Sequence, residues 1–212
     1  MACRQCRGIE QFFDRKEADR DLKGYRKKGP SKTTQMLIDA IEADGIADKT
    51  LLDIGGGVGA IQHGLLKAGA GAAVSVDAST AYIEAAKGEA QKQGHADRLQ
   101  QRHGDFVDIA PEIEPAHAVT LDRVICCYHD VERLVSLSSE RATRLYGLVY
   151  PRDNWMARTG FRLFNLFFRL RRSPFRIFVH PTATLDALVR RGGFEQSFYR
   201  KTLVWQVAVY TR

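Results

Sequence analysis

Short apolar runs alternate along the chain with longer segments in which apolar residues recur at helical spacing. The apolar runs predict strands at residues 50–54, 72–76, 98–103, 118–121, 146–150, 194–200 and 202–210. Helical spacing predicts helices at residues 31–44, 60–68, 80–93, 131–145 and 183–191. This alternation predicts an α/β fold: a three-layer αβα sandwich around a seven-stranded, mostly parallel sheet that ends in an antiparallel hairpin with a tight turn at Lys201.

Two segments fall outside this alternation, and we treat each as an addition to a main domain at residues 31–212. Residues 1–30 are polar and charge-dense with a thin apolar stripe, so we predict a short helix that packs on the domain as a cap. Residues 155–172 interleave large apolar residues with five arginines, which predicts a basic amphipathic helix inside a lid insertion at about 151–174. Such a helix can contact a membrane surface, cover a bulky apolar acidic substrate, or pack on the core with its basic edge in solvent.

Composition limits the class of protein. The chain has 212 residues, of which 44% are hydrophobic and 27% charged, as in a soluble globular domain with an extension. No apolar run approaches the roughly 20 residues that span a bilayer. The first ten residues lack the apolar core of a signal peptide, so we expect a cytoplasmic protein. The net charge of +7 suits an acidic ligand, RNA or an anionic membrane surface, and it also favours plain solubility.

The cysteines lie in two close pairs. Cys126 and Cys127 are adjacent, and Cys3-x-x-Cys6 has the spacing of half a zinc site or of a redox pair. No second half of a zinc site follows nearby, so two incidental thiols explain Cys3 and Cys6 as well, and we expect no metal site. This distribution is not that of a disulfide scaffold, which indicates a reducing compartment.

A glycine-rich turn follows the strand at residues 50–54 and opens the next helix. It reads Asp-x-Gly-x-Gly-x-Gly, with its glycines at positions where positive φ and the absence of a Cβ let a ligand lie against the backbone. Asp77 ends the next strand, 22 residues after Gly55, where a carboxylate can accept both hydroxyls of a ribose. The alternatives are a tight turn without a ligand and a strand-end acid that only caps the following helix.

These motifs, together with Gly104-Asp105-Phe106 after the third strand and the closing hairpin, resemble those of class I S-adenosylmethionine (SAM) methyltransferases. The chain looks most like the small-molecule members related to ubiquinone-type and magnesium-protoporphyrin O-methyltransferases. The resemblance implies a Rossmann-like methyltransferase fold, SAM as cofactor and S-adenosylhomocysteine (SAH) as product. It also implies cofactor contacts for Asp53, Gly55, Gly57, Gly59, Asp77, Ala78, Gly104, Asp105, Phe106, Asp122 and Arg123.

The segment after the fourth strand lies where the resemblance places the transferred methyl group. Tyr128 and His129 are the candidates for proton removal or acceptor placement there, although a surface turn explains His129 equally well. Tyr25, the pair Lys27-Lys28 and the helix from Trp155 are expected to form the acceptor pocket. Cys126 and Cys127 are as easily explained as small buried side chains.

We therefore predict a SAM-dependent methyltransferase that acts on a small molecule. The basic lid indicates an anionic acceptor, methylated on oxygen or sulfur, and possible contact of residues 155–172 with a membrane surface. The chain lacks the Asn/Asp-Pro-Pro-Tyr signature of amino-directed nucleic-acid enzymes, so we expect no nucleic-acid partner. Open alternatives are a soft acceptor such as an arsenical held by the cysteines, a non-catalytic RNA- or membrane-surface-binding module that retains SAM, and an NAD-dependent oxidoreductase.

Overall fold

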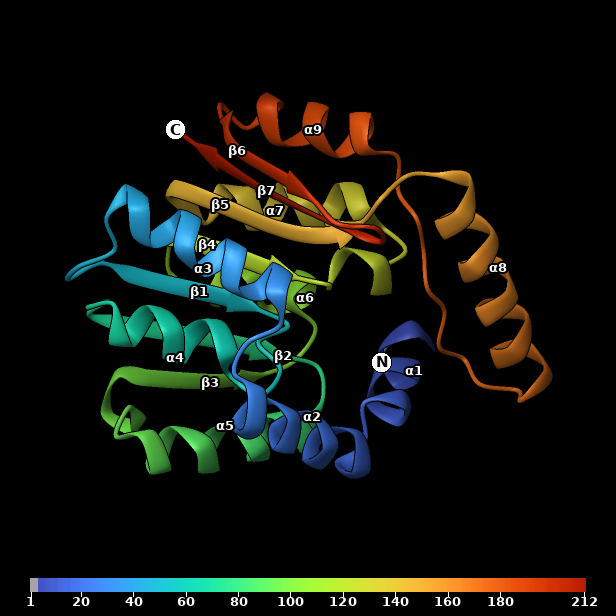
Figure 1. Ribbon diagram of the computed structural model, residues 1–212, viewed down its shortest axis with the longest axis horizontal. Helices are drawn as coiled ribbons and strands as arrows, with labels where there is room; N and C mark the ends of the chain where they lie inside the picture. The colour runs from blue at the N-terminus through green and yellow to red at the C-terminus, as the bar shows by residue number, and fades with distance from the viewer. Residues whose placement is uncertain (1–3) are drawn as a thin grey trace.

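The structure is a computed structural model that describes residues 4–212, with side chains from Arg7 onward. Seven strands form one sheet in the order β3-β2-β1-β4-β5-β7-β6, in which β7 runs antiparallel to both its neighbours and the other pairs are parallel (Figure 1). This topology confirms the predicted fold class. The strands are β1 (Thr50–Ile54), β2 (Ala72–Asp77), β3 (Leu99–His103), β4 (Ala116–Asp122), β5 (Ala142–Pro151), β6 (Glu195–Lys201) and β7 (Trp205–Thr211).

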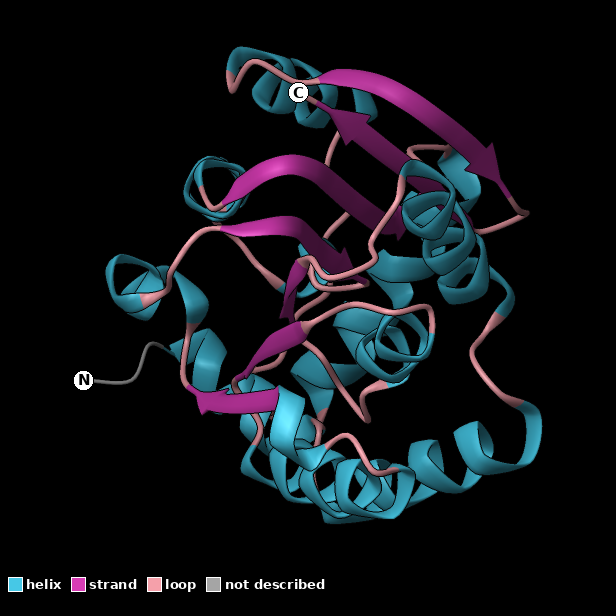
Figure 2. Cartoon of the chain, turned by 90° about the vertical axis from the view of Figure 1, so that its left-hand side faces the viewer, coloured by secondary structure: helices cyan, strands magenta, loops and turns pink. Residues whose placement is uncertain are grey.

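Helices cover both faces of this sheet (Figure 2). They are α3 (Lys32–Asp44), α4 (Ala60–Lys67), α5 (Thr80–Gln93), α6 (Phe106–Ile109), α7 (Val131–Glu140) and α9 (Thr182–Arg191). Successive strand side chains point to opposite faces, so Leu51 packs in the cluster with α3 and α4 whereas Leu52 packs in the cluster with α7 and α9. The central strands are buried on both faces, which explains why their sequences are continuous apolar runs.

The N-terminal segment forms two helices, α1 (Arg4–Phe12) and α2 (Arg15–Lys28), where the sequence predicts one. The side chain of Asp14 accepts a hydrogen bond from the Glu17 backbone N–H and starts α2. Two hydrogen bonds fix this segment to α5: the Ser79 hydroxyl donates to the Phe13 carbonyl (2.6 Å), and the Tyr82 hydroxyl donates to Asp21 (2.6 Å). The segment therefore lies across the carboxyl ends of the strands.

Two further boundary predictions are wrong. The helix predicted at residues 131–145 ends at Glu140, and Ala142 already pairs with Ala116 in β4. Pairing with β4 and burial of Ala142 and Leu145 in the sheet outweigh the helical spacing, which is a local property. The turn of the closing hairpin lies at residues 202–204, between β6 and β7, and not at Lys201.

Helix α8 (Trp155–Leu170) begins where predicted and ends two residues earlier than the predicted 172; it lies outside the αβα layers, on the right in Figure 1. Its Phe168 packs edge-on against Phe12 and Phe175, and these last two rings stack at 4.4 Å. Gly8 in α1 allows this approach, because a Cβ there would lie 2.6 Å from the backbone nitrogen of Phe175. Of the helices in residues 4–212, none combines the length and apolarity needed to cross a bilayer.

Candidate active site

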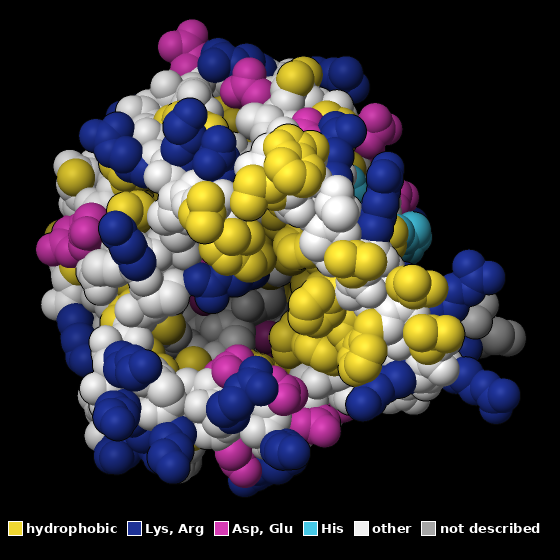
Figure 3. All heavy atoms as spheres, turned by 45° about the vertical axis from the view of Figure 1, so that its right-hand side comes forward, with side chains coloured by type: hydrophobic (Ala, Val, Ile, Leu, Met, Phe, Trp, Pro, Cys, Tyr) yellow, Lys and Arg dark blue, Asp and Glu magenta, His cyan; other side chains and the backbone are white. Residues whose placement is uncertain are grey.

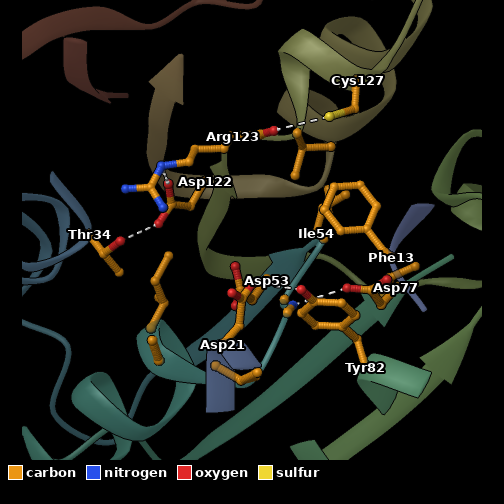
Figure 4. A pocket seen from close by; sticks show the side chains of 18 of the residues that line it. Phe13, Asp21, Thr34, Asp53, Ile54, Asp77, Tyr82, Asp122, Arg123 and Cys127 are labelled. Carbon is orange, nitrogen blue, oxygen red and sulfur yellow. Dashed lines mark hydrogen bonds and ion pairs between the residues drawn. The ribbon is translucent and has the colours of Figure 1, made fainter. Parts of the chain in front are cut away.

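A cavity of about 830 Å³ opens at the carboxyl ends of β1, β2 and β4 (Figure 4). Ligands of open parallel sheets bind at this edge. The loops after these strands and after β3 form one wall, and α2 with its connection to α3 forms the other. Of the residues predicted as cofactor contacts or catalytic candidates, all line the cavity except Gly59 and His129.

The glycine-rich turn places backbone against the cavity. Gly55, Gly57 and Gly59 have φ values of 67°, 55° and 89°, a region that favours glycine. A Cβ on Gly57 would meet nothing nearer than 3.9 Å, whereas one on Gly56 would lie 2.2 Å from Nε2 of Gln62. Gly57 thus faces open space in which a ligand can lie against the backbone, and Gly56 is required by the packing beneath. Gly59 lies outside the cavity and starts α4.

Asp53 is 1% exposed and lies beneath this turn. Its carboxylate accepts hydrogen bonds from Nε2 of Gln62 (3.0 Å) and from the Thr120 hydroxyl (2.7 Å). Burial raises the pKa of Asp53 to about 7, because these two neutral donors replace water only in part. No cation among the described residues pairs with Asp53, so the site offers a buried carboxylate to a positively charged ligand group.

Asp77 connects the glycine-rich turn to the start of α5. One carboxylate oxygen accepts the Gly57 backbone N–H (3.0 Å) and the other accepts the Ser79 backbone N–H (2.8 Å). Burial raises the pKa of Asp77. Each oxygen keeps acceptor capacity after these bonds, so the cap role and a contact with ligand hydroxyls are compatible. Ala78 continues the same wall.

The turn after β3 supplies Gly104, Asp105 and Phe106. Phe106 is buried at the cavity wall, and Asp105 caps α6 through the Val107 backbone N–H (3.0 Å). The Tyr128 hydroxyl donates to both oxygens of Asp105, at 2.9 and 3.1 Å. Burial and this carboxylate raise the pKa of Tyr128, so its phenol retains its proton and is unsuited to act as a base.

Asp122 and Arg123 follow β4 and meet the connection between α2 and α3. The Thr34 hydroxyl donates to Oδ2 of Asp122 (2.6 Å), and the Arg123 guanidinium donates to Oγ1 of Thr33 (2.9 Å) and lies over the Trp205 ring. Oδ1 of Asp122 and Nε of Arg123 lie 3.7 Å apart, and neither has a hydrogen-bond partner among the described residues. Burial raises the pKa of Asp122. Both atoms are buried, so they form an ion pair without a hydrogen bond.

His129 is the catalytic candidate that the structure does not bring to the site. It is exposed, stacks on the outer side of Tyr128 at 5.5 Å, and does not line the cavity. The residue lies on the turn that starts α7, so its side chain points to solvent while Tyr128 is buried. A histidine at a helix start is not distinguishable by sequence from one that points inward.

Only some of the other residues expected in the acceptor pocket lie at the cavity. Tyr25 and Lys28 line the cavity, whereas Lys27 and all of α8 do not. Helix α8 borders a separate groove of about 390 Å³, formed with residues 177–181. The pKa of Tyr25 is raised by burial, which disfavours it as a base.

The cysteines near the cavity are Cys126, which is buried, and Cys127, which lines it. Their sulfur atoms lie 3.8 Å apart. Cys3 and the side chain of Cys6 lie outside the described residues. Among the residues that the structure does describe, no group of three or more His, Cys, Asp or Glu side chains could hold a metal ion.

Sequence reasoning did not identify Asp21, Thr34 or Thr120, which hold Tyr82, Asp122 and Asp53 in place. Thr34 lies 88 residues from its partner in sequence. No local pattern signals such a contact.

Comparisons with known proteins agree with this geometry. The family described as "Methyltransferase domain" matches residues 52–144. Ribosomal protein L11 methyltransferase from Pasteurella multocida (strain Pm70) is 36% identical over 72 residues, which are 34% of this chain and 25% of that protein. The chain thus spans about a quarter of the length of this relative.

Two solved structures share the fold at low sequence identity. Magnesium protoporphyrin IX methyltransferase from Synechocystis PCC 6803, with bound SAH, has a TM-score of 0.75 at 17% identity, over 98% of this chain and 99% of that one. Geranyl diphosphate C-methyltransferase from Streptomyces coelicolor A3(2) has a TM-score of 0.68 at 14% identity, over 84% and 78% of the two chains. The shared architecture includes the strand ends that form the cavity described above.

Proposed function

We propose that this chain, a class I SAM-dependent methyltransferase by its family match and fold, methylates a small anionic molecule on oxygen or sulfur. The observation that carries the proposal is the division of charge within the cavity. Carboxylates of Asp53 and Asp77 lie at the ends of β1 and β2, whereas Lys28, Lys32 and the ion pair of Arg123 with Asp122 lie where β4 meets the α2–α3 connection. A cationic cofactor group suits the first region, and an anionic acceptor suits the second.

The cofactor end fits SAM by its donor set and its open backbone. SAM, when bound, would supply an electrophilic methyl group on its sulfonium; an acceptor would attack that carbon in line, and SAH would leave as the neutral thioether when the C–S bond breaks. Asp53 would pair with the ammonium of the methionine part, and Asp77 would accept the ribose hydroxyls. Phe106 would lie on the adenine ring, with Asp105 beside the amino group. Gly57 leaves room for the ligand against the turn.

The acceptor end positions an anion and excludes water. The Arg123 guanidinium donates to Thr33 and lies 3.7 Å from Asp122, and it would turn to donate to an incoming carboxylate. Its backbone holds a left-handed φ of 62°, fixed by an N–H bond to the Val149 carbonyl (2.8 Å). A carboxylate or thiolate acceptor needs no proton removal near neutral pH. This agrees with Tyr25 and Tyr128, both of which have raised pKa values.

An acceptor panel with radiolabelled SAM tests the proposal. Aliphatic and aromatic carboxylates, thiols, neutral alcohols and amines would be compared on wild type, Arg123→Gln and a matched control, Arg102→Gln. Arg102 is paired with Glu112 and lies outside the cavity wall. We expect labelling of acids or thiols only, and a KM at least tenfold higher in Arg123→Gln with SAH affinity retained. Labelling of neutral acceptors that is indifferent to Arg123 would contradict the proposal.

The sequence leaves RNA and a membrane surface as partners for a non-catalytic role. Between these two, the exposed side chains of α8 favour the membrane. Helix α8 exposes large apolar side chains together with its arginines. RNA-binding surfaces combine basic grooves with stacking aromatic rings, whereas aliphatic side chains such as Leu163 and Leu170 have no role there. Contact of α8 with a membrane is compatible with catalysis at the cavity.

A further inference from the structure

Helix α8 exposes an apolar face that no other described part of the chain covers. Trp155 is 75% exposed, Leu163 63% and Leu170 76%. Met156, Phe164 and Phe167 are about half exposed on the same helix. Leu163, Phe167 and Leu170 follow at intervals of four and three residues, so they share one side of the helix. Exposed apolar area of this kind marks an interaction surface.

The hairpin between β6 and β7 extends this apolar face. Leu203 at its tip is 73% exposed. The Arg152 backbone N–H donates to the Val204 carbonyl (2.8 Å), and its guanidinium donates to the Thr202 carbonyl (3.2 Å). These bonds hold the tip beside the start of α8. We call Trp155, Met156, Leu163, Phe164, Phe167, Leu170 and Leu203 the apolar platform.

Arginines flank the apolar platform, and acids are absent from its segment. Residues 154–180 contain six arginines and no Asp, Glu or Lys. With 3.6 residues per turn, Arg162 and Arg169 lie on one border of the apolar face, and Arg171 lies at its C-terminal end. Arg171 lies over the Phe167 ring at 4.4 Å. An apolar face bordered by arginines is the pattern of a helix that lies in a membrane interface.

The opposite side of α8 is fixed to the protein, so the platform is presented in one orientation. The Asn165 amide forms two hydrogen bonds with the Ile177 backbone, at 2.7 and 2.8 Å. Phe168 is buried against Phe12 and Phe175. Preorganisation of this kind lowers the entropic cost of docking.

We propose that the apolar platform and its arginines dock on an anionic lipid bilayer. Figure 3 shows hydrophobic side chains gathered beside a hollow on this face of the molecule. A second copy of the chain is disfavoured as the occupant, because a symmetric contact would bring the arginine borders of two acid-free segments together. The inference rests on the proposed function in one respect: an anionic acceptor dissolved in the bilayer would then enter from the docked side.

Vesicle flotation tests the docking without requiring methyl transfer. Purified protein would be mixed with phosphatidylcholine vesicles, or with vesicles that contain 30% phosphatidylglycerol, at low and high salt. The variants are Leu163→Ser/Phe167→Ser/Leu170→Ser on the platform and Arg162→Gln/Arg169→Gln on its border. Lys87→Gln/Arg191→Gln, on α5 and α9, removes the same charge elsewhere. The thermal shift with SAH in every variant reports the state of the cofactor site.

We expect wild type to float with the anionic vesicles only, and less at high salt. The platform triple variant should lower the partition coefficient at least tenfold, and the border variant roughly fivefold for each arginine. The α5/α9 control should bind as wild type does. No flotation of wild type, equal flotation with neutral vesicles, or a dimer that the triple variant converts to monomer would overturn the inference. Failure of the SAH shift in wild type would instead overturn the proposed function and leave the flotation result standing.

Discussion

The buried carboxylate of Asp53 makes a prediction about stability that can be worked out from its surroundings. In Asp53→Asn, the amide oxygen can still accept from Gln62, and the amide N–H can donate to the Thr120 oxygen. The Thr120 hydroxyl then turns to the Leu52 carbonyl, 3.5 Å away. The substitution therefore removes a buried charge and keeps the bonds to Gln62 and Thr120, while one amide N–H gains no partner among these residues.

The magnitude follows from the pKa. A rise in the pKa of Asp53 from 3.8 to about 7 lowers the free energy of unfolding by about 4 kcal/mol at pH 8. The sign follows from proton binding: between pH 3.8 and 7 the folded state holds the proton that the unfolded state has lost. Stability present below pH 3.8 is thus lost as the pH rises through 7. The amide forms weaker hydrogen bonds than the carboxylate, which costs about 1 kcal/mol. The free energy of unfolding of Asp53→Asn at pH 8 should therefore exceed that of wild type by about 3 kcal/mol.

The assay is thermal and urea unfolding of both proteins without ligand at pH 4.5, 6 and 8. At pH 8 the variant should melt roughly 6–12 °C above wild type, and the difference should shrink towards pH 4.5. Other carboxylates titrate in both proteins, so their contributions cancel in the difference in stability between variant and wild type. Asp97→Asn, an exposed change, should follow wild type at each pH. SAH should stabilise Asp53→Asn less than wild type, because the variant cannot pair with the ligand ammonium.

Two results would refute this reasoning. Equal stability of the two proteins at pH 8 would mean that Asp53 is not a destabilising buried charge. A stability gain that is the same at pH 4.5 and pH 8 would mean that the gain has a source other than ionisation. A gain with unchanged SAH binding would retain the burial argument and remove Asp53 from the cofactor site.

Four other substitutions give distinct outcomes. Gly56→Ala should lower the free energy of unfolding, measured in urea, by about 2 kcal/mol or more, because its Cβ would meet Gln62 and Ser75 at 2.2 and 2.3 Å. Gly88→Ala is the control: this position on α5 faces open space, so the substitution should raise the free energy of unfolding by about 0.5–1 kcal/mol. Tyr128→Phe should leave the pH profile of methyl transfer unchanged, since its phenol is protonated throughout; a lost basic limb would contradict this. Phe168→Ala should remove the packing that fixes α8, with about 3 kcal/mol lost locally and faster proteolysis at residues 171–174 as the readout.

The sheet and the cofactor end of the site could be predicted because their signals are local. Asp53 and the glycine-rich turn lie within seven residues, and Asp77 ends a strand that is apolar on both faces. Such positions are set by backbone geometry, which the sequence encodes over short distances.

The acceptor end could not be predicted in the same way. Thr34 reaches Asp122 across 88 residues, and α2 closes the cavity through Asp21 and Tyr82. Residues 142–145 joined β5 because β4 was available to pair with them, which no helical pattern reveals. His129 differs from Tyr128 by one position in a turn, and that position decides which side chain is buried.

Calorimetric titration with SAH, supported by thermal shift, tests the central claim most directly. Wild type, Asp77→Ala and the exposed control Asp97→Ala would be titrated with SAH and with NAD. We predict one SAH per wild-type chain, with about 2.7 kcal/mol of stabilisation at 100 times the dissociation constant, or roughly 5–10 °C. The signal should be lost in Asp77→Ala, kept in Asp97→Ala, and absent with NAD. No binding of SAH to wild type, or binding that Asp77→Ala leaves intact, would contradict the account.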